Sequence, residues 1–432
     1  MLNKIKSVSS PLAARSKSVQ SGPEQYLVAL DVGTEYVKAL IAKVSDSDIE
    51  IVGQGRAHQQ LSDMQAGAIA DIGGVVQNCS QALALAEEEA GVSVRTAVIG
   101  IAGELVKGTT TTVPCRRKDP ELEIDVDEME QIISLAQERA STKAKENLAL
   151  ELGNAQLDVR LVNSALVGIT IDGYQVTNPI GFKGRDMTIQ LYTAFAPMIH
   201  IAALERTAKE LDLDLLAVAA EPFAVARSVI GDNPNASMSA VLMDVGGGTT
   251  DIAVVNDGGV QGTKMFGIGG RAFTRSIERD LSTDYEMAEK LKLSVGENTL
   301  PAKQFDAVNE ALDKTCDVWV AGVELALSEF TELDHVPHRI LLCGGGASLP
   351  NLTASLKETK WYSDVPFTRK PVIDFITPDQ IVGIKDKTGH VNDHTFVTAM
   401  GLLRVGSDTF QQQSDSRSGG TIKERFDRIL RV

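Results

Sequence analysis

The stretch that decides the fold is residues 240–255, AVLMDVGGGTTDIAVV. An apolar run leads into Asp244, glycines and threonines follow, and a second apolar run closes the stretch. This pattern predicts a strand, a tight turn and a second strand. The turn contains Gly246, Gly247, Gly248 and Thr249. Glycines carry no Cβ atoms, so backbone N–H groups here can point at an oxyanion such as a phosphate. On this stretch alone, an ordinary hairpin turn is the alternative interpretation.

A second stretch has the same pattern. Residues 27–42 read LVALDVGTEYVKALIA, with Asp31, Gly33 and Thr34 after the first apolar run. Lys38 lies in the following predicted strand, where it could reach back to a phosphate. An aspartate at the end of a buried strand suits a hydrated Mg²⁺, and both hairpins provide one. Two such hairpins predict an internal duplication with a nucleotide held between two similar halves.

A third glycine loop follows a short apolar strand at residues 340–343. It comprises Gly344, Gly345, Gly346 and Ala347, and Pro350 then opens a predicted helix. A strand that leads through a glycine turn into a helix is a common nucleotide-binding element.

These three motifs, in this order, resemble the superfold shared by actin, Hsp70 and the sugar kinases, over about residues 26–406. Finer motifs are similar to those of the bacterial FtsA family. They are GIGGRAFTRSI at 267–277, AEKLKL at 288–293, LLCGGGASL at 341–349, NPIGFKG at 178–184 and the pair Glu221-Pro222.

The resemblance implies an α/β, actin-like, duplicated two-lobe fold with an inserted α+β subdomain of the SHS2 type and a C-terminal amphipathic helix. The expected segments are a disordered tail (1–25), first-lobe parts (26–107, 198–238 and 388–406), the insertion (108–197), the second lobe (239–387), a flexible linker (407–420) and a membrane-targeting helix (421–432).

The resemblance also implies ATP and Mg²⁺ as ligands. Gly269 and Gly270 would add phosphate contacts, the third loop would hold adenosine, and Glu289 and Lys292 would flank the nucleoside. A surface ion pair is the alternative for those two residues, which lie three apart and so share a helix face. Glu221 would orient water as a catalytic residue beside Asp244. A carboxylate favoured by the helix dipole is its structural alternative. The expected activity is at most that of a weak ATPase.

The family's partners are the tubulin-like protein FtsZ, bound through its C-terminal tail, other division proteins and further copies of itself. The inserted subdomain would be the self-association and docking surface, or else a lobe without a binding role. The expected location is the inner face of the cell membrane at the division site. Residues 297–311 are fewer than the family usually has, which puts the FtsZ surface in doubt.

That short segment favours the runner-up, a PilM-like cytoplasmic platform for type IV pilus assembly. A phosphotransferase of the superfold is a third hypothesis, but no sugar-binding signature is visible.

Composition sets broad limits. The net charge of −16 argues against nucleic acid as the main partner. The four cysteines are far apart and form no CxxC, which indicates a reducing cytoplasm. Residues 1–25 lack a long apolar run, so they are no secretory signal. A disordered tail is the first interpretation, and a basic tail on an anionic membrane the second.

Local patterns predict further elements. A helix is expected over residues 71–90, with Leu85 among its apolar positions, and another over 126–140. Two separate strands are expected at 157–163 and 165–171. Residues 407–420 are rich in Gln, Ser, Asp and Gly without apolar periodicity, and this predicts a linker.

The last twelve residues, TIKERFDRILRV, have an amphipathic pattern. Ile422, Phe426, Ile429 and Leu430 share one helical face, and Lys423, Arg425 and Arg428 add positive charge. Such a helix is too short to cross a bilayer but can lie in its interface, with basic groups near anionic lipid headgroups. A terminal helix that docks on its own domain is the alternative.

Overall fold

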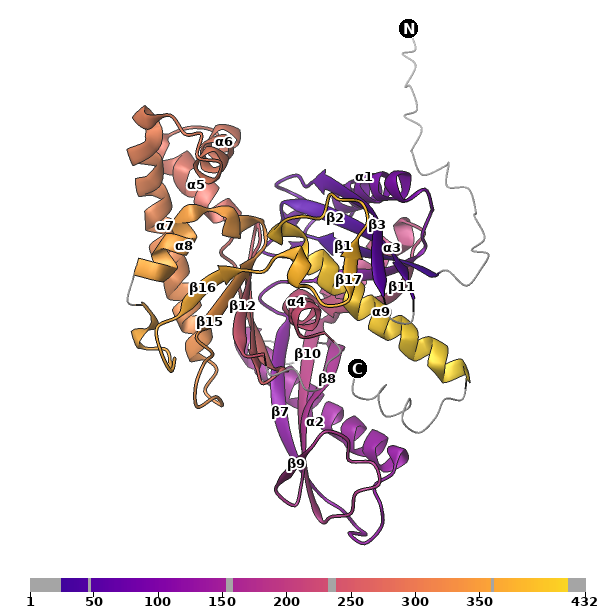
Figure 1. Cartoon of the computed structure of the whole chain (residues 1–432). Coiled ribbons are helices and arrows are strands. Elements are labelled where there is room, and N and C mark those ends of the chain that lie inside the picture. The colour runs from indigo at the N-terminus through magenta and orange to yellow at the C-terminus, as the bar shows by residue number, and fades with distance from the viewer. Residues whose placement is uncertain (1–24, 46–47, 153–157, 232–237, 359–360, 419–432) are drawn as a thin grey trace.

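The computed structural model describes residues 25–45, 48–152, 158–231, 238–358 and 361–418. Its elements form two lobes and a subdomain that projects from their junction (Figure 1). The fold is α/β and actin-like, as the sequence predicts. The amphipathic segment 421–432 and residues 1–24 lie outside the described residues.

The first lobe contains a six-stranded sheet in the order β11-β6-β1-β2-β3-β17. Its strands are β1 Gln25–Val32, β2 Tyr36–Val44, β3 Ile49–His58, β6 Thr96–Ile101, β11 Asp214–Ala220 and β17 Ile384–Asp386. Helices α1 Ile72–Ala90 and α3 Met198–Glu210 contact each other over this sheet, and α4 Glu221–Ile230 contacts α9 Val397–Ser418. Gly53 and Gly55 bring α1 close to β3, because ideal Cβ atoms there would lie 2.2 Å and 1.9 Å from helix carbonyl oxygens.

The second lobe repeats this design. Its strands are β12 Ala240–Val245, β13 Thr250–Asn256, β14 Gly259–Phe266, β15 Arg339–Cys343 and β16 Val372–Phe375. Its helices are α5 Gly270–Leu281, α6 Tyr285–Gly296, α7 Ala302–Ser328 and α8 Pro350–Glu358. In each lobe an antiparallel hairpin is flanked by a parallel strand, since β1 pairs with β6 and β12 with β15. This repetition confirms the predicted duplication.

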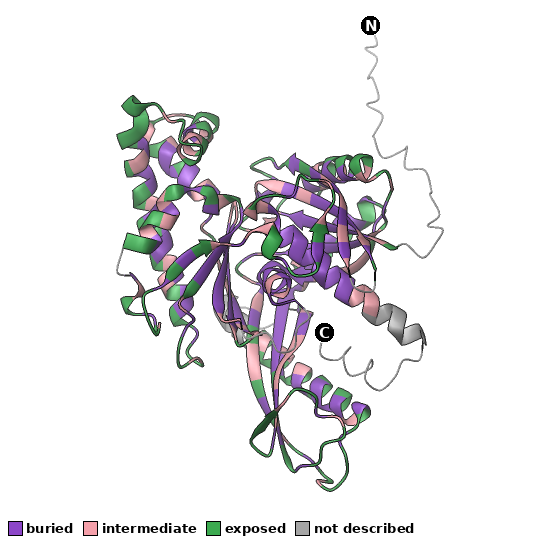
Figure 2. Cartoon of the chain, viewed as in Figure 1, coloured by how far each residue is buried: buried purple, intermediate pink, exposed green. Residues whose placement is uncertain are grey.

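Alternate residues of β12 belong to different cores, as the two-residue period of a strand requires. Val241, Met243 and Val245 pack with residues of α5 to α8. Ala240 and Leu242 belong to the core of the first lobe, which includes α4 and α9. The lobes are therefore joined at their base by a shared apolar core, which is the buried centre of Figure 2.

The inserted subdomain comprises β7 Lys107–Arg116, α2 Val126–Leu152, β8 Val159–Ile171, β9 Tyr174–Val176 and β10 Asp186–Pro197. Its sheet is continuous with that of the second lobe, because β7 pairs with β14 at Gly262–Thr109 and Thr263–Gly108. An ideal Cβ at Gly108 would lie 2.1 Å from Thr263 Oγ1, so this junction requires glycine. The sequence did not predict this connection between segments far apart in the chain.

Four local predictions differ from the structure. The helix expected to end at residue 140 continues to Leu152, and the two strands expected at 157–171 form the single strand β8. Leu85 of α1 is exposed rather than buried. The expected linker is helical as far as Ser418, because α9 continues from a buried segment in which Asp408 pairs with Arg227.

Shorter elements complete the fold. They are the hairpin of β4 Met64–Gln65 and β5 Ala68–Ile69, and the 3₁₀ turns Gly345–Ser348, Trp361–Ser363, Pro378–Gln380 and His394–Phe396.

Candidate functional site

The two glycine turns of the duplicated hairpins face each other across the junction of the lobes. The second turn closes through a hydrogen bond from the Gly246 amide to the Thr249 carbonyl oxygen at 2.9 Å. An ideal Cβ at Gly247 would lie 2.8 Å from Glu35 Cβ, and one at Gly248 would lie 2.6 Å from Thr34 Oγ1. Side chains at either glycine would therefore push the turns apart.

The first turn lies between β1 and β2, where Asp31 and Lys38 occupy paired positions. The Lys38 ammonium donates to Asp31 Oδ2 at 2.8 Å, and both side chains are largely buried. Burial alone would lower the pKa of Lys38, but the nearby carboxylates of Asp31 and Asp244 outweigh it and raise that pKa. Lys38 therefore remains a cation at the centre of the site.

The third loop closes the site from the end of β15. Gly344 has a φ of +82°, and an ideal Cβ there would lie 1.9 Å from Asp244 Oδ1. The backbone conformation and the space both require glycine. Gly345, Gly346 and Ala347 follow in a 3₁₀ turn, and an ideal Cβ at Gly346 would lie 2.7 Å from Val245.

A cavity of about 80 Å³ lies between these loops. Its lining includes Asp31, Gly33, Thr34, Lys38, Glu221, Asp244, Gly246, Gly247, Thr249, Asp251, Gly344 and Gly345. Residues of all three motifs therefore converge. The cavity is smaller than the roughly 300–1,000 Å³ typical of sites that enclose a small ligand.

Four buried carboxylates and the ammonium of Lys38 meet beside this cavity, whose lining also includes the half-buried Glu35 and the exposed Arg56. The four carboxylates belong to Asp31, Glu221, Asp244 and Asp251. Burial raises the pKa of Asp244, and the hydrogen bond donated by Thr398 Oγ1 opposes that increase. Burial, reinforced by neighbouring carboxylates, raises the pKa values of Glu221 and Asp251 well above their ordinary range.

Glu221 reaches the cavity from the first turn of α4, where Pro222 follows it. An ideal Cβ at Gly100 would lie 2.7 Å from Glu221 Oε1, so the neighbouring strand leaves room for this side chain.

Asp251 and Thr398 are two site residues that sequence reasoning did not assign. Asp251 lies in the buried strand β13, and its Oδ1 atom has no hydrogen-bond partner among the residues that the structure describes. An acidic residue within an otherwise apolar strand was the available signal. Thr398 had none, because it comes from the distant helix α9.

The surplus of buried negative charge fits a divalent cation. In the described residues, no group of three His, Cys, Asp or Glu side chains could hold a metal by itself. Mg²⁺ commonly binds through one or two carboxylates together with waters and substrate phosphates. The Asp31, Asp244 and Asp251 carboxylates suit that mode of binding.

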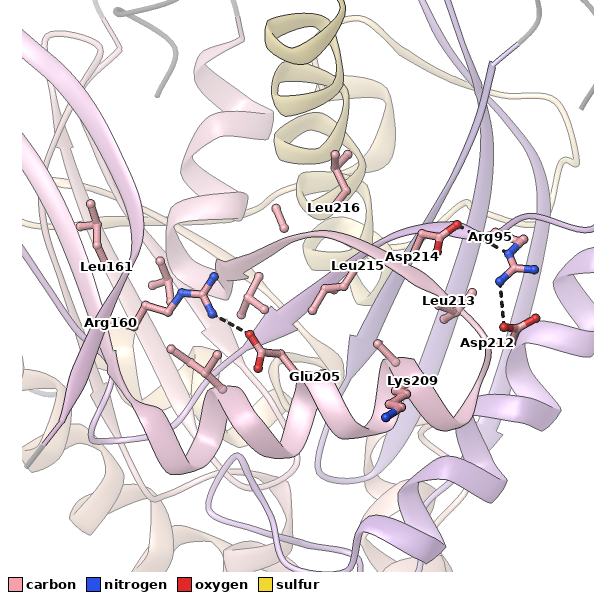
Figure 3. Close-up of a pocket in the computed structure, with 15 residues that line it drawn as sticks. Arg95, Arg160, Leu161, Glu205, Lys209, Asp212, Leu213, Asp214, Leu215 and Leu216 are labelled. Carbon is pink, nitrogen blue, oxygen red and sulfur yellow. Dashed lines mark hydrogen bonds and ion pairs between the residues drawn. The ribbon is translucent and has the colours of Figure 1, made fainter. Parts of the chain in front are cut away.

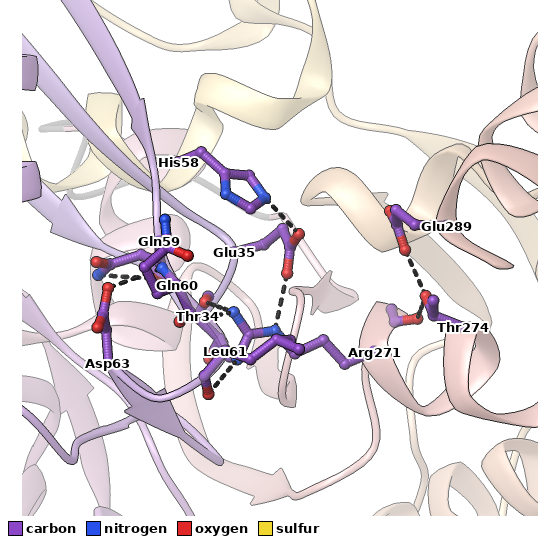
Figure 4. Close-up of polar contacts among 12 residues, drawn as sticks. Thr34, Glu35, His58, Gln59, Gln60, Leu61, Asp63, Arg271, Thr274 and Glu289 are labelled. Carbon is purple, nitrogen blue, oxygen red and sulfur yellow. Dashed lines mark hydrogen bonds and ion pairs between the residues drawn. The ribbon is translucent and has the colours of Figure 1, made fainter. Parts of the chain in front are cut away.

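Helices α5 and α6 bring the predicted nucleoside residues together. The Lys292 ammonium pairs with Glu289 Oε2 at 2.8 Å and donates to Thr274 Oγ1 at 2.9 Å. Thr274 Oγ1 in turn donates to Glu289 at 2.5 Å (Figure 4). The side chains of Lys292 and Glu289 are only 14% and 20% exposed, so this is not a loose surface pair.

The start of α5 differs from the expectation that its amides face a phosphate. The amides of Gly270 and Arg271 donate to the carbonyl oxygens of Gly246 and Gly247, at 2.9 Å and 2.7 Å. An ideal Cβ at Gly269 would lie 2.7 Å from the Gly246 carbonyl oxygen. These contacts from the start of α5 hold the second glycine turn in place.

A second cavity, of about 500 Å³, lies where α3, β11 and β8 meet (Figure 3). Leu215, Leu216 and Ala217 of the edge strand β11 line it. Arg160 of the inserted subdomain pairs with Glu205 of α3 at 2.6 Å on one side of it. This cavity lies outside the three-loop site.

Comparisons with known proteins match the motifs of this site. A family model described as "Cell division protein FtsA" matches residues 241–401, which include the second and third glycine loops. FtsA of Pseudomonas aeruginosa is 25% identical over 422 residues, which cover 93% of each chain. The chain is thus similar to FtsA proteins over most of its length. FtsA of Neisseria meningitidis is 28% identical over 276 residues, 63% of this chain and 62% of that protein.

One solved structure shares the fold without close sequence similarity. It is described as "PilM-PilN type IV pilus biogenesis complex", has a TM-score of 0.63 and 15% identity, and covers 88% of this chain and 98% of that chain. This likeness supports the actin-like fold, whereas the relatives compared by sequence are FtsA proteins. No helix in the described residues is both long and apolar enough to cross a membrane.

Proposed function

We propose that this chain is an actin-like cell-division protein that binds ATP with Mg²⁺ between its two lobes. The observation that carries this proposal is the convergence of two glycine turns, Lys38 and four carboxylates on one cavity. The similarity to FtsA proteins supports the role in cell division.

In this proposal, the first turn and Lys38 hold one side of the phosphates and the second turn holds the other. Backbone N–H groups in glycine-rich turns form concave anion sites. The ammonium of Lys38 offsets phosphate charge from within a buried environment. Gly269 and Gly270 support the second turn, whereas Gly344, Gly345, Gly346 and Ala347 bind the adenosine end with Glu289 and Lys292.

The carboxylates have complementary roles. Asp31 and Asp244 would hold Mg²⁺ through water, and Asp251 would offer a third carboxylate. The cation supplies charge neutralisation for the phosphates. Glu221, whose raised pKa favours the proton-bound form, orients a water molecule by hydrogen bonding. Only slow hydrolysis is expected, because a protonated Glu221 cannot accept a proton from that water.

ATP acts in this proposal mainly as a conformational ligand. The cavity of about 80 Å³ is too small for a nucleotide, so the lobes must open to admit ATP and then close over it. A ligand shifts such an equilibrium by its differential affinity for the two states. The nucleotide-bound state would then present the inserted subdomain and the second lobe for self-assembly.

Asp244→Ala tests the coupling of nucleotide to assembly. Sedimentation with Mg²⁺–ATP is expected to pellet the wild-type chain and leave the variant in the supernatant. Asp257→Asn, in an exposed turn of the same lobe, is the control and should pellet, because asparagine tolerates the left-handed backbone found there. Normal sedimentation of Asp244→Ala would show that assembly does not depend on this site.

The proposed location is the cytoplasmic face of the inner membrane at the division site. Residues 421–432 would bind anionic lipid through Ile422, Phe426, Ile429 and Leu430, with Lys423, Arg425 and Arg428 near the headgroups. FtsZ would bind the rest of the chain through its C-terminal tail. Other division proteins would also bind there. The apolar strand edge in the second cavity offers one docking surface for an extended peptide.

A further inference from the structure

Arg271 crosses from the second lobe to the first. Its backbone amide belongs to the start of α5 and holds the second glycine turn through the Gly247 carbonyl oxygen. Its side chain extends to the first glycine turn, where Nε donates to Glu35 Oε2 at 2.8 Å and Nη2 donates to the Thr34 carbonyl oxygen at 2.6 Å (Figure 4). One residue therefore ties the two turns together.

Every hydrogen-bond acceptor of this guanidinium lies in the first lobe. Nη1 donates to the Met64 carbonyl oxygen at 3.2 Å, and longer contacts reach the carbonyl oxygens of Leu61 and Gln60. The Arg271 side chain is 11% exposed and that of Glu35 is 19% exposed. Charge-assisted bonds of this kind in a partly buried setting are stronger than bonds between neutral groups.

The first lobe holds its side of this contact rigidly. His58 Nε2 lies 2.9 Å from the other carboxylate oxygen of Glu35, and the Gln59 amide donates to the Glu35 carbonyl oxygen at 2.9 Å. Asn78 donates to both Gln59 and Asp63 from α1. The acceptors of Arg271 therefore belong to one hydrogen-bonded network, and α5 cannot move away from the first turn without breaking the contacts of the guanidinium.

We infer that Arg271, Glu35 and the carbonyl oxygens of Thr34 and Met64 form an interlobe latch that controls nucleotide exchange. Shared apolar core joins the lobes at their base, so opening of the cavity requires the turns to separate. The latch joins those turns directly. Arg271 is absent from the cavity lining, whereas its partners Thr34 and Glu35 belong to that lining. Arg271 is therefore a positioning residue that acts through the first turn.

A direct phosphate contact by Arg271 is the competing explanation, and the two explanations predict opposite results for Glu35→Gln. If the guanidinium bound phosphate, loss of the Glu35 charge would free it and slow nucleotide release. If Arg271 is a latch, the same change weakens closure and speeds release. Arg271→Lys distinguishes the two explanations again, because lysine keeps the positive charge but lacks the planar guanidinium that reaches several acceptors.

The test measures release of N-methylanthraniloyl-ADP with Mg²⁺ by stopped flow, chased with excess ATP. Arg271→Ala, Arg271→Lys and Glu35→Gln are expected to speed release by about tenfold, the change that corresponds to the loss of one charge-assisted hydrogen bond. Arg279→Ala is the matched control, since this arginine of α5 pairs with Asp280 at its own end of the helix. Unchanged release in Arg271→Ala, or slower release in Glu35→Gln, would overturn the latch.

This readout rests on the proposed nucleotide site, so a second measurement needs no nucleotide. Hydrogen–deuterium exchange of the free Arg271→Ala chain should increase at residues 33–36, 60–65 and 267–272. Exchange in the core of α1 should not change, which confirms that the variant is folded. If the chain binds no nucleotide but hydrogen–deuterium exchange increases as expected, the proposed function fails, whereas Arg271 still holds the two lobes together. If exchange does not increase at these residues, the latch is wrong.

Discussion

Asp251 has a buried carboxylate oxygen without a hydrogen-bond partner in the described part of the chain, beside three other buried acidic side chains. Such a group costs stability unless a ligand compensates it. Binding sites often retain destabilising groups of this kind because function requires them. Removing the charge of Asp251 should therefore stabilise the nucleotide-free chain and weaken ligand binding.

Asp251→Asn is expected to stabilise the nucleotide-free chain by about 0.5–2 kcal/mol, within the range found when destabilising functional groups are removed. The pKa of Asp251 is higher in the folded chain than in the unfolded chain. The carboxylate therefore destabilises the folded chain fully above the folded-state pKa and not at all below the unfolded-state pKa. The gain should thus be larger at alkaline pH than at mildly acidic pH in urea unfolding. A loss of stability in Asp251→Asn at both pH values would contradict this explanation.

Helix α9 shows where local sequence patterns are insufficient to predict the end of an element. Residues 407–418 lack apolar periodicity, yet they continue a helix whose preceding part packs against β1, β6 and α4. Arg227 Nη2 lies 2.7 Å from Asp408 Oδ2, and Ser407 is buried. Tertiary packing therefore extends the helix beyond the point at which composition predicts a linker.

Asp408→Ala should lower the free energy of unfolding by about 2 kcal/mol, because it leaves Arg227 without this charged partner. Glu310→Ala is the control, since it removes an exposed pair with Lys314 within α7 and should cost less than about 1 kcal/mol. Chemical denaturation measures both. If both variants change the free energy of unfolding negligibly, a flexible segment from residue 407 onward would be favoured.

The sequence predicted the elements whose signals are local. Asp71 caps α1 and Gly91 ends it in a left-handed conformation, and the hairpins around Asp31 and Asp244 follow from their apolar runs and glycines. The pairing of β7 with β14, the bond from Thr398 to Asp244 and the reach of Arg271 to Glu35 join distant segments. No local pattern encodes those contacts, because they depend on how complete elements pack.

The proposed protein joins a nucleotide-controlled, two-lobed body to a terminal membrane contact. The chain has a net charge of −16, yet residues 421–432 carry more basic than acidic side chains. An acidic body is repelled by anionic lipid, so a local basic amphipathic segment would have to provide the attraction.

Co-sedimentation with anionic vesicles tests this arrangement. The full chain should pellet with lipid, whereas a chain that ends at Gly420 should remain in the supernatant. Phe426→Glu, which keeps the length but interrupts the apolar face, should also stay in solution. If the full chain fails to pellet, membrane anchoring is wrong and a cytoplasmic pilus-assembly platform becomes the better proposal.

Calorimetric titration of ATP into the chain, with and without Mg²⁺, measures whether both ligands bind between the facing glycine turns. Mg²⁺-dependent binding to wild type is expected, weakened at least about tenfold in Asp244→Asn through loss of a charged ligand, and unchanged in the exposed-turn control Asp257→Asn. Equal affinity in Asp244→Asn and wild type, or no ATP binding by the wild-type chain, would contradict binding between the turns.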